Sequence, residues 1–240
     1  MTAATPRRVR FRDIASWISQ SCGLVFRKPL YWISVAILLW AVAIAITFVP
    51  IVGNYLRMVY SGLFGALTLA LAFTQLSGEG ISLRRALSIL APVLPALLVL
   101  SLLDLALFAF IDLPVLRAIA TDREFDVYAL TALRNGSARH SVDLVHTIVL
   151  TLASSVFGFA APLVMFSGSS LWSALRGSVA AFALSFPVYV TYDVVTVIIP
   201  HTLAATVGIP GIALFLIIAI LLTPSGIFMY RSAFGGEPLN

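Results

Sequence analysis

Two aspartates lie inside long apolar stretches of the chain, where a carboxyl group has few partners. Asp104 falls within an apolar run at 91–111, and Asp193 falls within another at 179–200. A charged side chain at the centre of a bilayer costs about 2.5–3.5 kcal/mol on insertion scales, so such residues usually face the interior of a helix bundle and have a partner. Arg57, near the outer end of another apolar run, is the natural counter-ion. We therefore treat Asp104, Asp193 and Arg57 as a candidate intramembrane polar network.

Three interpretations of this network are open. In the first, Asp104 or Asp193 pairs structurally with Arg57, with Tyr192 or with a hydroxyl group. In the second, the two carboxyls belong to a path for a polar substrate or for protons. In the third, the aspartates are protonated and have no special role. At a rise of 1.5 Å per helical residue, the two carboxyls lie about 12 Å and about 10 Å inward from the outer ends of their runs, within reach of Arg57.

Other residues that could do chemistry are few. His146 and His201 fall near the outer ends of apolar runs, and together with Asp143 they could be drawn as a metal site; His140 is the third histidine. The sequence has no HExxH, no CxxC and no short His-x-His spacing, so we interpret all three as surface or rim histidines. It also has neither a GxxxxGK[ST] loop nor a GxSxG elbow. We therefore predict no catalytic residues, no metal and no cofactor, in a protein that is not an enzyme.

The apolar stretches themselves define the class of fold. About 20 helical residues cover a hydrocarbon core of roughly 30 Å, and six runs are close to that length. Of the 240 residues, 60% are hydrophobic and 10% are charged, whereas soluble domains have roughly 25% charged residues. The runs are continuous rather than alternating, which argues against a β-barrel. The six runs are 30–49, 59–76, 91–111, 145–166, 179–200 and 211–230.

We therefore predict an all-α protein, a polytopic transmembrane helical bundle of about six spans. The second and fifth spans are the weaker ones, because Arg57 lies near the start of one and Asp193 lies inside the other. Four spans with two re-entrant segments are the topological alternative.

Basic residues set the expected orientation. A group of them precedes the first run: Arg7, Arg8, Arg10, Arg12, Arg27 and Lys28. Because cytoplasmic loops are enriched in Lys and Arg, the N-terminus is predicted in the cytoplasm, and an even number of spans returns the C-terminus there. The basic residues are almost all arginine, which suggests a GC-rich bacterial genome. The predicted location is therefore the bacterial inner membrane.

Three parts follow from these boundaries. Residues 1–29 form a cytoplasmic basic segment with an amphipathic interfacial helix, residues 30–231 form the six-span domain, and residues 232–240 form a cytoplasmic tail. An extracytoplasmic loop at about 113–143 is the one sizeable soluble piece. We expect it to contain a helix that begins at Thr121, because Thr121 and Glu124 have capping-box spacing.

A short amphipathic stretch leads to a proline near a span start three times, at Pro29, Pro95 and Pro187. In the second and third copies, Ser-Leu and Ala-Leu pairs coincide, and one gap aligns Asp104 with Asp193. This pattern predicts a threefold repeat in which each unit is an interfacial helix, an outward span and an inward span. Some transporters use parallel repeats of this kind, and plain duplication of a helical hairpin also produces them.

The first amphipathic stretch has apolar residues near helical spacing and is flanked by Arg12, Arg27 and Lys28. Such a helix can lie in the headgroup layer and attract anionic lipid, so these three residues are candidate lipid-headgroup contacts. Alternatively, the helix packs beneath the bundle, and the two interpretations are compatible.

Several short motifs together resemble a known family. They are FRKPLYW, VPIVG, SLRRAL, APLVMF, SLWSAL and MYRSAF. The pattern is similar to a bacterial family of six-span inner-membrane proteins known mostly as conserved proteins of unknown function. It is more distantly similar to the membrane domain attached to some glycerophosphodiester phosphodiesterases. The resemblance implies a six-span membrane fold, and it transfers no functional residue.

Two functions are consistent with these observations. The first is a non-enzymatic integral membrane protein that acts by association, as an accessory or scaffold subunit or as an organiser of lipid or of a partner. The alternative is a small transporter or channel that uses Asp104 and Asp193. The expected partners are membrane lipid and a larger membrane-protein complex. The net charge of +5 requires no nucleic-acid partner, because the basic residues lie beside the spans.

Overall fold

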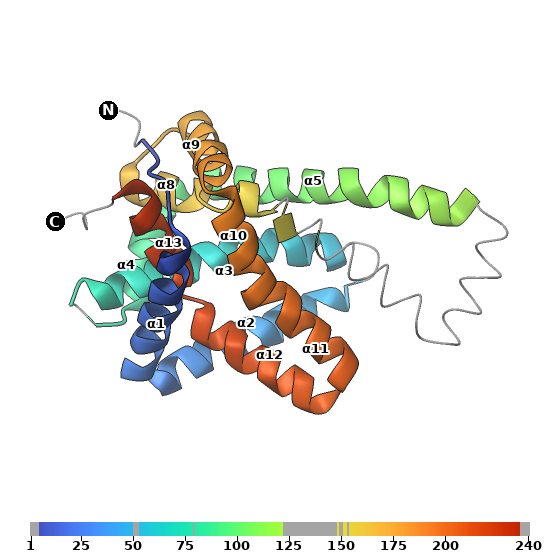
Figure 1. The fold of residues 1–240 in the computed structure, drawn as a ribbon, viewed down its shortest axis with the longest axis horizontal. Coiled ribbons are helices and arrows are strands. Elements are labelled where there is room, and N and C mark those ends of the chain that lie inside the picture. The colour runs from blue at the N-terminus through green and yellow to red at the C-terminus, as the bar shows by residue number, and fades with distance from the viewer. Residues whose placement is uncertain are drawn as a thin grey trace.

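The structure is a computed structural model, and it describes residues 5–49, 53–78, 80–121, 148, 151–152 and 154–235. Over these ranges the chain forms helices joined by turns and no strand, so the predicted all-α class is confirmed (Figure 1). The helices are α1 (Phe11–Arg27), α2 (Pro29–Thr47), α3 (Gly53–Leu76), α4 (Leu83–Leu90), η1 (Ala91–Val93), α5 (Leu94–Thr121), α8 (Ala160–Ser167), α9 (Leu171–Leu184), α10 (Phe186–Asp193), η2 (Val194–Ile198), α11 (Ile199–Val207), α12 (Ile209–Leu222) and α13 (Ser225–Phe234).

Four helical stretches of the described chain are long and apolar enough to cross a membrane, and there are up to five if one bent pair counts as a span. The four are Pro29–Thr47, Tyr55–Leu76, Leu83–Phe110 and Phe186–Ala204, and the bent pair is Ile209–Leu222 with Ser225–Phe234. Large apolar side chains cover the outside of these helices; Leu30 is 80% exposed and Ile209 is 83% exposed. Lipid, unlike water, accommodates such a surface. The protein is therefore membrane-embedded.

The second half of the chain differs from the six predicted spans. The fourth predicted span lies partly outside the described residues, and the apolar helix Ser154–Ser167 there is shorter than the four long ones. The fifth begins later than predicted, because α9 ends at Leu184 and the spanning stretch begins at Phe186. The sixth is bent by 45° between α12 and α13, where Pro224 has no amide hydrogen to continue the helix.

The third predicted span continues further than expected. Helix α5 runs to Thr121, so Thr121 is the last residue of a long helix and not the start of a separate one. Its predicted capping partner, Glu124, and the remainder of the predicted loop lie outside the described residues.

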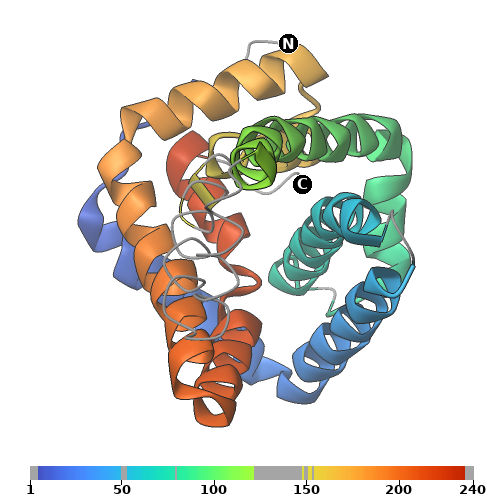
Figure 2. The ribbon, with the colours of Figure 1, turned by 90° about the vertical axis from the view of Figure 1, so that its right-hand side faces the viewer.

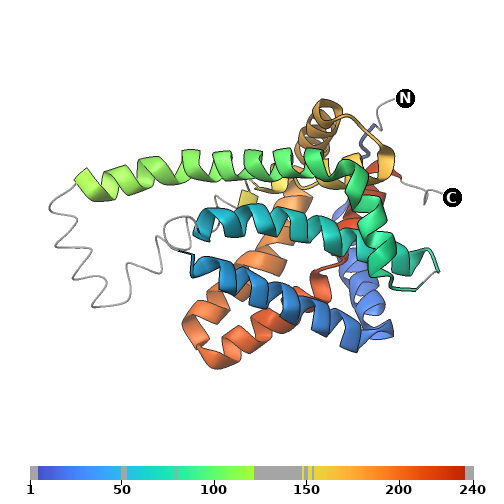
Figure 3. The same ribbon diagram turned by 180° about the vertical axis from the view of Figure 1, so that it is seen from behind.

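Helices α2, α3 and α5 lie side by side with α3 in the middle, as the views in Figures 2 and 3 show. Helices α10, η2 and α11 follow one another as a second long rod, and α12 packs back along α11. Their connection is a tight turn at Gly208, which has φ +71°. Helix α13 follows α12 and contacts α3 and α1. It therefore connects the group formed by α10, η2, α11 and α12 with the group formed by α2, α3 and α5.

The order of elements recurs three times along the described chain. A helix (α1, α4 or α9) is followed by a break and then by an apolar stretch that begins with α2, α5 or α10, and the third stretch continues from α10 through η2 into α11. The inward span that the predicted repeat requires in its second unit lies partly outside the described residues. The prolines stand in the first turn of each long helix: Pro29 in α2, Pro95 in α5 and Pro187 in α10. Proline is tolerated there because its missing amide hydrogen would have no partner within the helix. Pro29 and Pro187 follow the last residues of α1 and α9 by two and three positions, whereas α4 ends at Leu90, two residues before Pro92 in η1.

Helix α1 packs against the bundle along one face. Trp17 is 1% exposed, and its indole Nε1 donates to Ser232 Oγ at 2.8 Å. The Ser21 hydroxyl donates to Leu221 O at 2.6 Å. Of the candidate headgroup contacts, Arg12, Arg27 and Lys28 are all exposed. The amphipathic helix thus buries its apolar face in protein and leaves its basic residues uncovered.

The two ends of the described chain lie together, at the left of Figure 1. The Arg7 amide donates to Ala233 O at 2.6 Å. Two residues further along, the Val9 amide donates to Ser185 Oγ at 2.8 Å. These bonds fix the N-terminal segment against α13 and against the break between α9 and α10.

Candidate functional site

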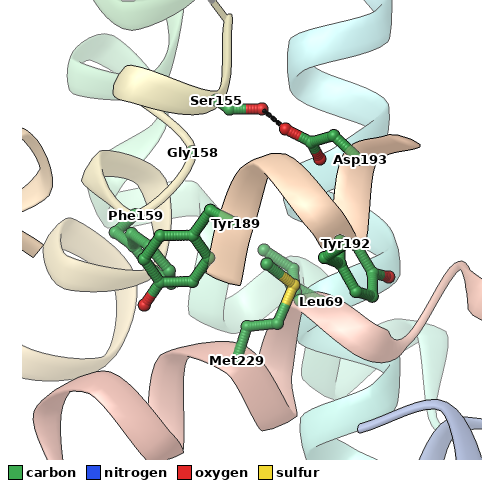
Figure 4. A pocket seen from close by; sticks show the side chains of 9 residues that line it. Leu69, Ser155, Gly158, Phe159, Tyr189, Tyr192, Asp193 and Met229 are labelled. Atoms are coloured by element: carbon green, nitrogen blue, oxygen red, sulfur yellow. Dashed lines mark hydrogen bonds between the residues drawn. The ribbon is translucent and has the colours of Figure 1, made fainter. Parts of the chain in front are cut away.

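A cavity of about 220 Å³ lies between α3, α10, α13 and the turn that precedes α8 (Figure 4). We call it the Asp193 cavity. It lies where the two groups of helices meet, so residues from the first and last thirds of the chain face one another across it. Its polar groups come from Ser155, Tyr189, Tyr192 and Asp193, and its apolar wall includes Leu69 and Met229.

Asp193 is held inside this cavity by a hydroxyl group. Its side chain points toward Ser155, and it is 7% exposed. The Ser155 hydroxyl lies 2.6 Å from Asp193 Oδ2 and 2.8 Å from Thr151 O. Sequence reasoning included a hydroxyl among the partners of Asp193 but did not single out Ser155. The one available signal is that Ser155 interrupts a predicted apolar run.

Tyr192, the other predicted partner of Asp193, is engaged elsewhere. Its hydroxyl is hydrogen-bonded to Ser225 Oγ, and the Ser225 hydroxyl also lies 2.6 Å from Leu222 O. Tyr192 is buried, and its ring lies edge-on to that of Trp17 at 5.7 Å. Tyr192 therefore links α10 to α13 and α1, and the carboxyl of Asp193 is left to Ser155.

A π-helical turn follows Asp193 directly. In η2 the backbone bond skips one extra residue, from the Ile199 amide to Val194 O. Pro200 lies just beyond, and a proline removes one amide donor and crowds the carbonyl four residues earlier. Such single π-turns are frequent at functional sites. The turn sets the rotation of the helix at the point where Asp193 faces the cavity.

A second cavity, of about 170 Å³, lies between α3, α5 and the start of the α8 region. We call it the Asp104 cavity. Leu97, Ser101 and Asp104 lie on one face of α5, at spacings of four and three residues, and all three line it. Asp104 Oδ1 is buried without a hydrogen-bond partner. A buried polar atom without a partner costs about 1–3 kcal/mol, so it requires a physical explanation.

Small residues on α3 give the Asp104 cavity its shape. Gly62 lies so close to α5 that a Cβ atom built on it would collide with Ser101 Oγ. Gly65, one turn further along α3, has no atom within 4 Å of such a Cβ. Both glycines line the cavity. The first glycine brings the two helices together, and the second leaves space between them.

The two cavities adjoin. Leu69 and Gly158 line both, and the consecutive residues Ser154 and Ser155 line one cavity each. In the described part of the chain, two buried side-chain polar atoms have no hydrogen-bond partner: Asp104 Oδ1 and the Tyr189 hydroxyl oxygen. Each of the two adjoining cavities is therefore lined by one residue with an unsatisfied polar atom, Tyr189 in the Asp193 cavity and Asp104 in the Asp104 cavity.

The predicted counter-ion is not part of this site. Arg57 is exposed, and no ion pair joins it to Asp104 or Asp193. Within the described ranges, the ion pair present is Arg12 with Asp13 at 4.0 Å, on the surface of α1. The structure thus separates Arg57 from the two aspartates and gives one of them a serine as its partner.

Of the residues considered for a metal site, His201 packs edge-on against the Phe215 ring at 6.2 Å. The other two, Asp143 and His146, lie outside the described residues, as does His140, the third histidine.

The fold defines a helical integral membrane protein whose mainly apolar core contains two cavities, each with an aspartate in its lining. Comparison of the chain with protein-family models, with curated proteins and with solved structures gives no match.

Proposed function

We propose that this protein is a small membrane transporter or channel, and that Asp104 and Asp193 line its path. The observation that carries the proposal is the pair of adjoining cavities, each with one of these aspartates in its lining. Asp104 lies nine residues after Pro95 and Asp193 lies six residues after Pro187, each on the first long apolar stretch of its proposed repeat unit. Repeats that place ligand groups near the membrane interior are a common transporter architecture.

A purely structural role accounts less well for the geometry. Polar side chains that only hold helices together have their hydrogen-bonding groups satisfied, as Tyr192 does with Ser225. Asp104 Oδ1 has no such partner, and it belongs to a cavity that also contains hydroxyl groups of Ser61 and Ser101. Buried polar groups inside a membrane domain usually mark a substrate or ion path.

The proposed setting is the bacterial inner membrane, with both chain ends in the cytoplasm. The support is the cluster of basic residues on and before α1, together with the backbone bond from Arg7 to Ala233. Because that bond keeps the two ends adjacent, tags on both ends should be accessible from one face of sealed vesicles. Tags that report opposite faces would contradict this topology.

Purified full-length protein in liposomes tests the transport proposal. Currents on solid-supported membranes would be recorded after concentration jumps of H⁺, Na⁺, K⁺ and small amino acids, with empty liposomes as the control. We expect a current for at least one of these solutes and its loss in the double variant Asp104→Asn, Asp193→Asn. A folded wild-type protein that gives no current for any of them would rule the proposal out.

Association with a partner is the second candidate function, and one observation favours it. Only 11% of the most apolar stretch of α2 is buried inside the protein, so nearly all of this helix is free to pack against lipid or another span. Native purification followed by mass spectrometry tests it. A clean monomer with no co-purifying protein or lipid would count against an accessory or scaffold role.

A further inference from the structure

The Ser155 hydroxyl has one hydrogen but lies within bonding distance of two acceptors. Thr151 O is 2.8 Å away, and Asp193 Oδ2 is 2.6 Å away. A hydroxyl can donate only once, although it can also accept. If Asp193 is ionised, Ser155 donates to one acceptor and the other contact is not a hydrogen bond. If Asp193 is protonated, its own O–H donates to Ser155 Oγ and Ser155 donates to Thr151 O, so both contacts become hydrogen bonds.

One proton added to Asp193 therefore makes both contacts of the Ser155 hydroxyl hydrogen bonds. Binding forms an O–H bond at Asp193 Oδ2 and rotates the Ser155 hydrogen onto Thr151 O; release reverses both changes and breaks only that O–H bond. The exchange needs no oxidant, reductant or metal. It changes the charge of Asp193 by one unit, in a site where the residue is 7% exposed.

The other groups that face Asp193 come from every element around the cavity. Tyr189 and Tyr192 stand on α10 itself, Leu69 on α3, and Gly226 and Met229 on α13. The described lining contains no basic side chain, and the Tyr192 hydroxyl is bonded to Ser225. An ionised Asp193 thus has no cationic partner in this cavity, and a proton is the smallest species that neutralises it.

Leu69 is the described residue with a side chain that lines both cavities. Its Cδ2 atom lies where a Cβ on Gly226 would come within 2.9 Å. The absence of a side chain at Gly226 thus allows Leu69 to fill the space between α3 and α13. Gly158 forms the rest of the shared wall.

We infer that Asp104 and Asp193 are two successive proton-binding sites on one path through the adjoining cavities, and that Leu69 is the barrier between them. This inference rests on the proposed transport function and names its substrate. A bound alkali ion would need several oxygen ligands at once, whereas a proton needs one carboxyl oxygen and a bonded neighbour. Asp193 and Ser155 meet that requirement. Asp104, whose Oδ1 atom has no hydrogen-bond partner, supplies the second proton-binding carboxyl group.

Proton flux into liposomes tests the inference directly. Full-length protein is reconstituted with a trapped pH-sensitive dye, and a potassium diffusion potential, negative inside, drives entry. We expect lumenal acidification with wild-type protein, about tenfold slower in Asp193→Asn and about tenfold faster in Leu69→Ala, because rates change tenfold for small changes in barrier height. Leu69→Phe should slow the flux. Leu67→Ala is the matched control, since Leu67 is also half-buried on α3 but lines neither cavity.

The outcomes separate the inference from the proposed function. Currents with Na⁺, K⁺ or amino acids but no proton flux would overturn the inference and leave transport standing. Proton flux that is unchanged in both Leu69→Ala and Leu69→Phe would overturn Leu69 as the barrier. Gel filtration of each variant establishes that it is folded, and Leu69→Met, which conserves volume, should behave as wild type. An absence of any current with folded wild-type protein would remove both proposals.

Discussion

Ser155 and Asp193 lie 38 positions apart in the chain, yet their side-chain oxygens approach to 2.6 Å. The contact joins the turn before α8 to the C-terminal residue of α10. It is the one side-chain hydrogen bond that the structure shows for either of the two aspartates that the sequence places inside apolar runs, within the part of the chain that the structure describes.

Removing the Ser155 hydroxyl should destabilise the protein. Ser155→Ala leaves a buried carboxyl oxygen without its donor, which costs about 1–3 kcal/mol. Thermal unfolding in detergent, followed by tryptophan fluorescence, measures the loss. Ser88→Ala is the control: Ser88 is exposed on α4 and lines neither cavity, and surface substitutions usually change stability by less than about 0.5 kcal/mol. Equal effects of the two substitutions would show that the Ser155–Asp193 bond contributes nothing.

Replacing Asp104 should have the opposite effect on stability. Its Oδ1 is buried without a partner, so Asp104→Leu removes an uncompensated polar group. We expect unfolding to be shifted in the stabilising direction, by up to about 1–3 kcal/mol, while proton flux is lost. Asp193→Leu should instead destabilise, since it breaks a hydrogen bond. If Asp104→Leu were as destabilising as Asp193→Leu, Asp104 would have to be satisfied by a partner.

The two glycines of the Asp104 cavity should respond differently to alanine. A methyl group at Gly62 would collide with Ser101 Oγ, so Gly62→Ala should force α3 and α5 apart and cost about 1–3 kcal/mol. Gly65→Ala meets no atom within 4 Å and should stabilise α3 by up to about 1 kcal/mol through helix propensity. Both variants are compared by thermal unfolding. The prediction fails if Gly65→Ala is the more damaging change.

Trp17 should hold α1 on the bundle. It is 1% exposed, and it stacks on Tyr189 at 6.0 Å in addition to its bond with Ser232. Trp17→Ala should cost about 3–5 kcal/mol and make α1 accessible to protease. Trp172, which is 63% exposed, provides the matched control, and Trp172→Ala should leave both stability and cleavage near wild type. Equal protease resistance of the two variants would contradict the docking of α1.

The sequence predicts the class of this fold well, and the limits of each helix less well. Apolar run length is enough to identify membrane helices, and the prolines at 29, 95 and 187 mark where long helices begin. The same reasoning does not reveal bends, because an apolar run does not show that the helix changes direction by 45° at Pro224. Helix α5 likewise continues past the charged residues that were expected to end it.

For the site, the sequence identifies two of the residues but not their partners. An aspartate inside an apolar run is a strong signal, because placing a carboxylate within the membrane costs free energy whichever way the helix packs. Its neighbours depend on how helices pack, and Ser155 is one serine among many. The prediction of Arg57 as the counter-ion is wrong, because Arg57 is exposed and forms no ion pair with either aspartate. Opposite charges at similar expected depths need not lie on helix faces that meet. The sequence analysis gives the accessory role first, and we propose transport instead on the ground of the two cavities.

The docking of α1 has a consequence for how the chain is made. Trp17 bonds to Ser232, 215 positions later, and synthesis at about 5–20 residues per second puts roughly 10–40 s between the two. During that interval α1 can contact α2 and α3, but the contacts of its apolar face with α10, α12 and α13 cannot yet form. The surface of the membrane is the nearest place where that face can be sheltered, with Arg12, Arg27 and Lys28 toward the lipid phosphates. An early lipid-bound stage and a final protein-bound stage would then be successive steps in the assembly of one molecule.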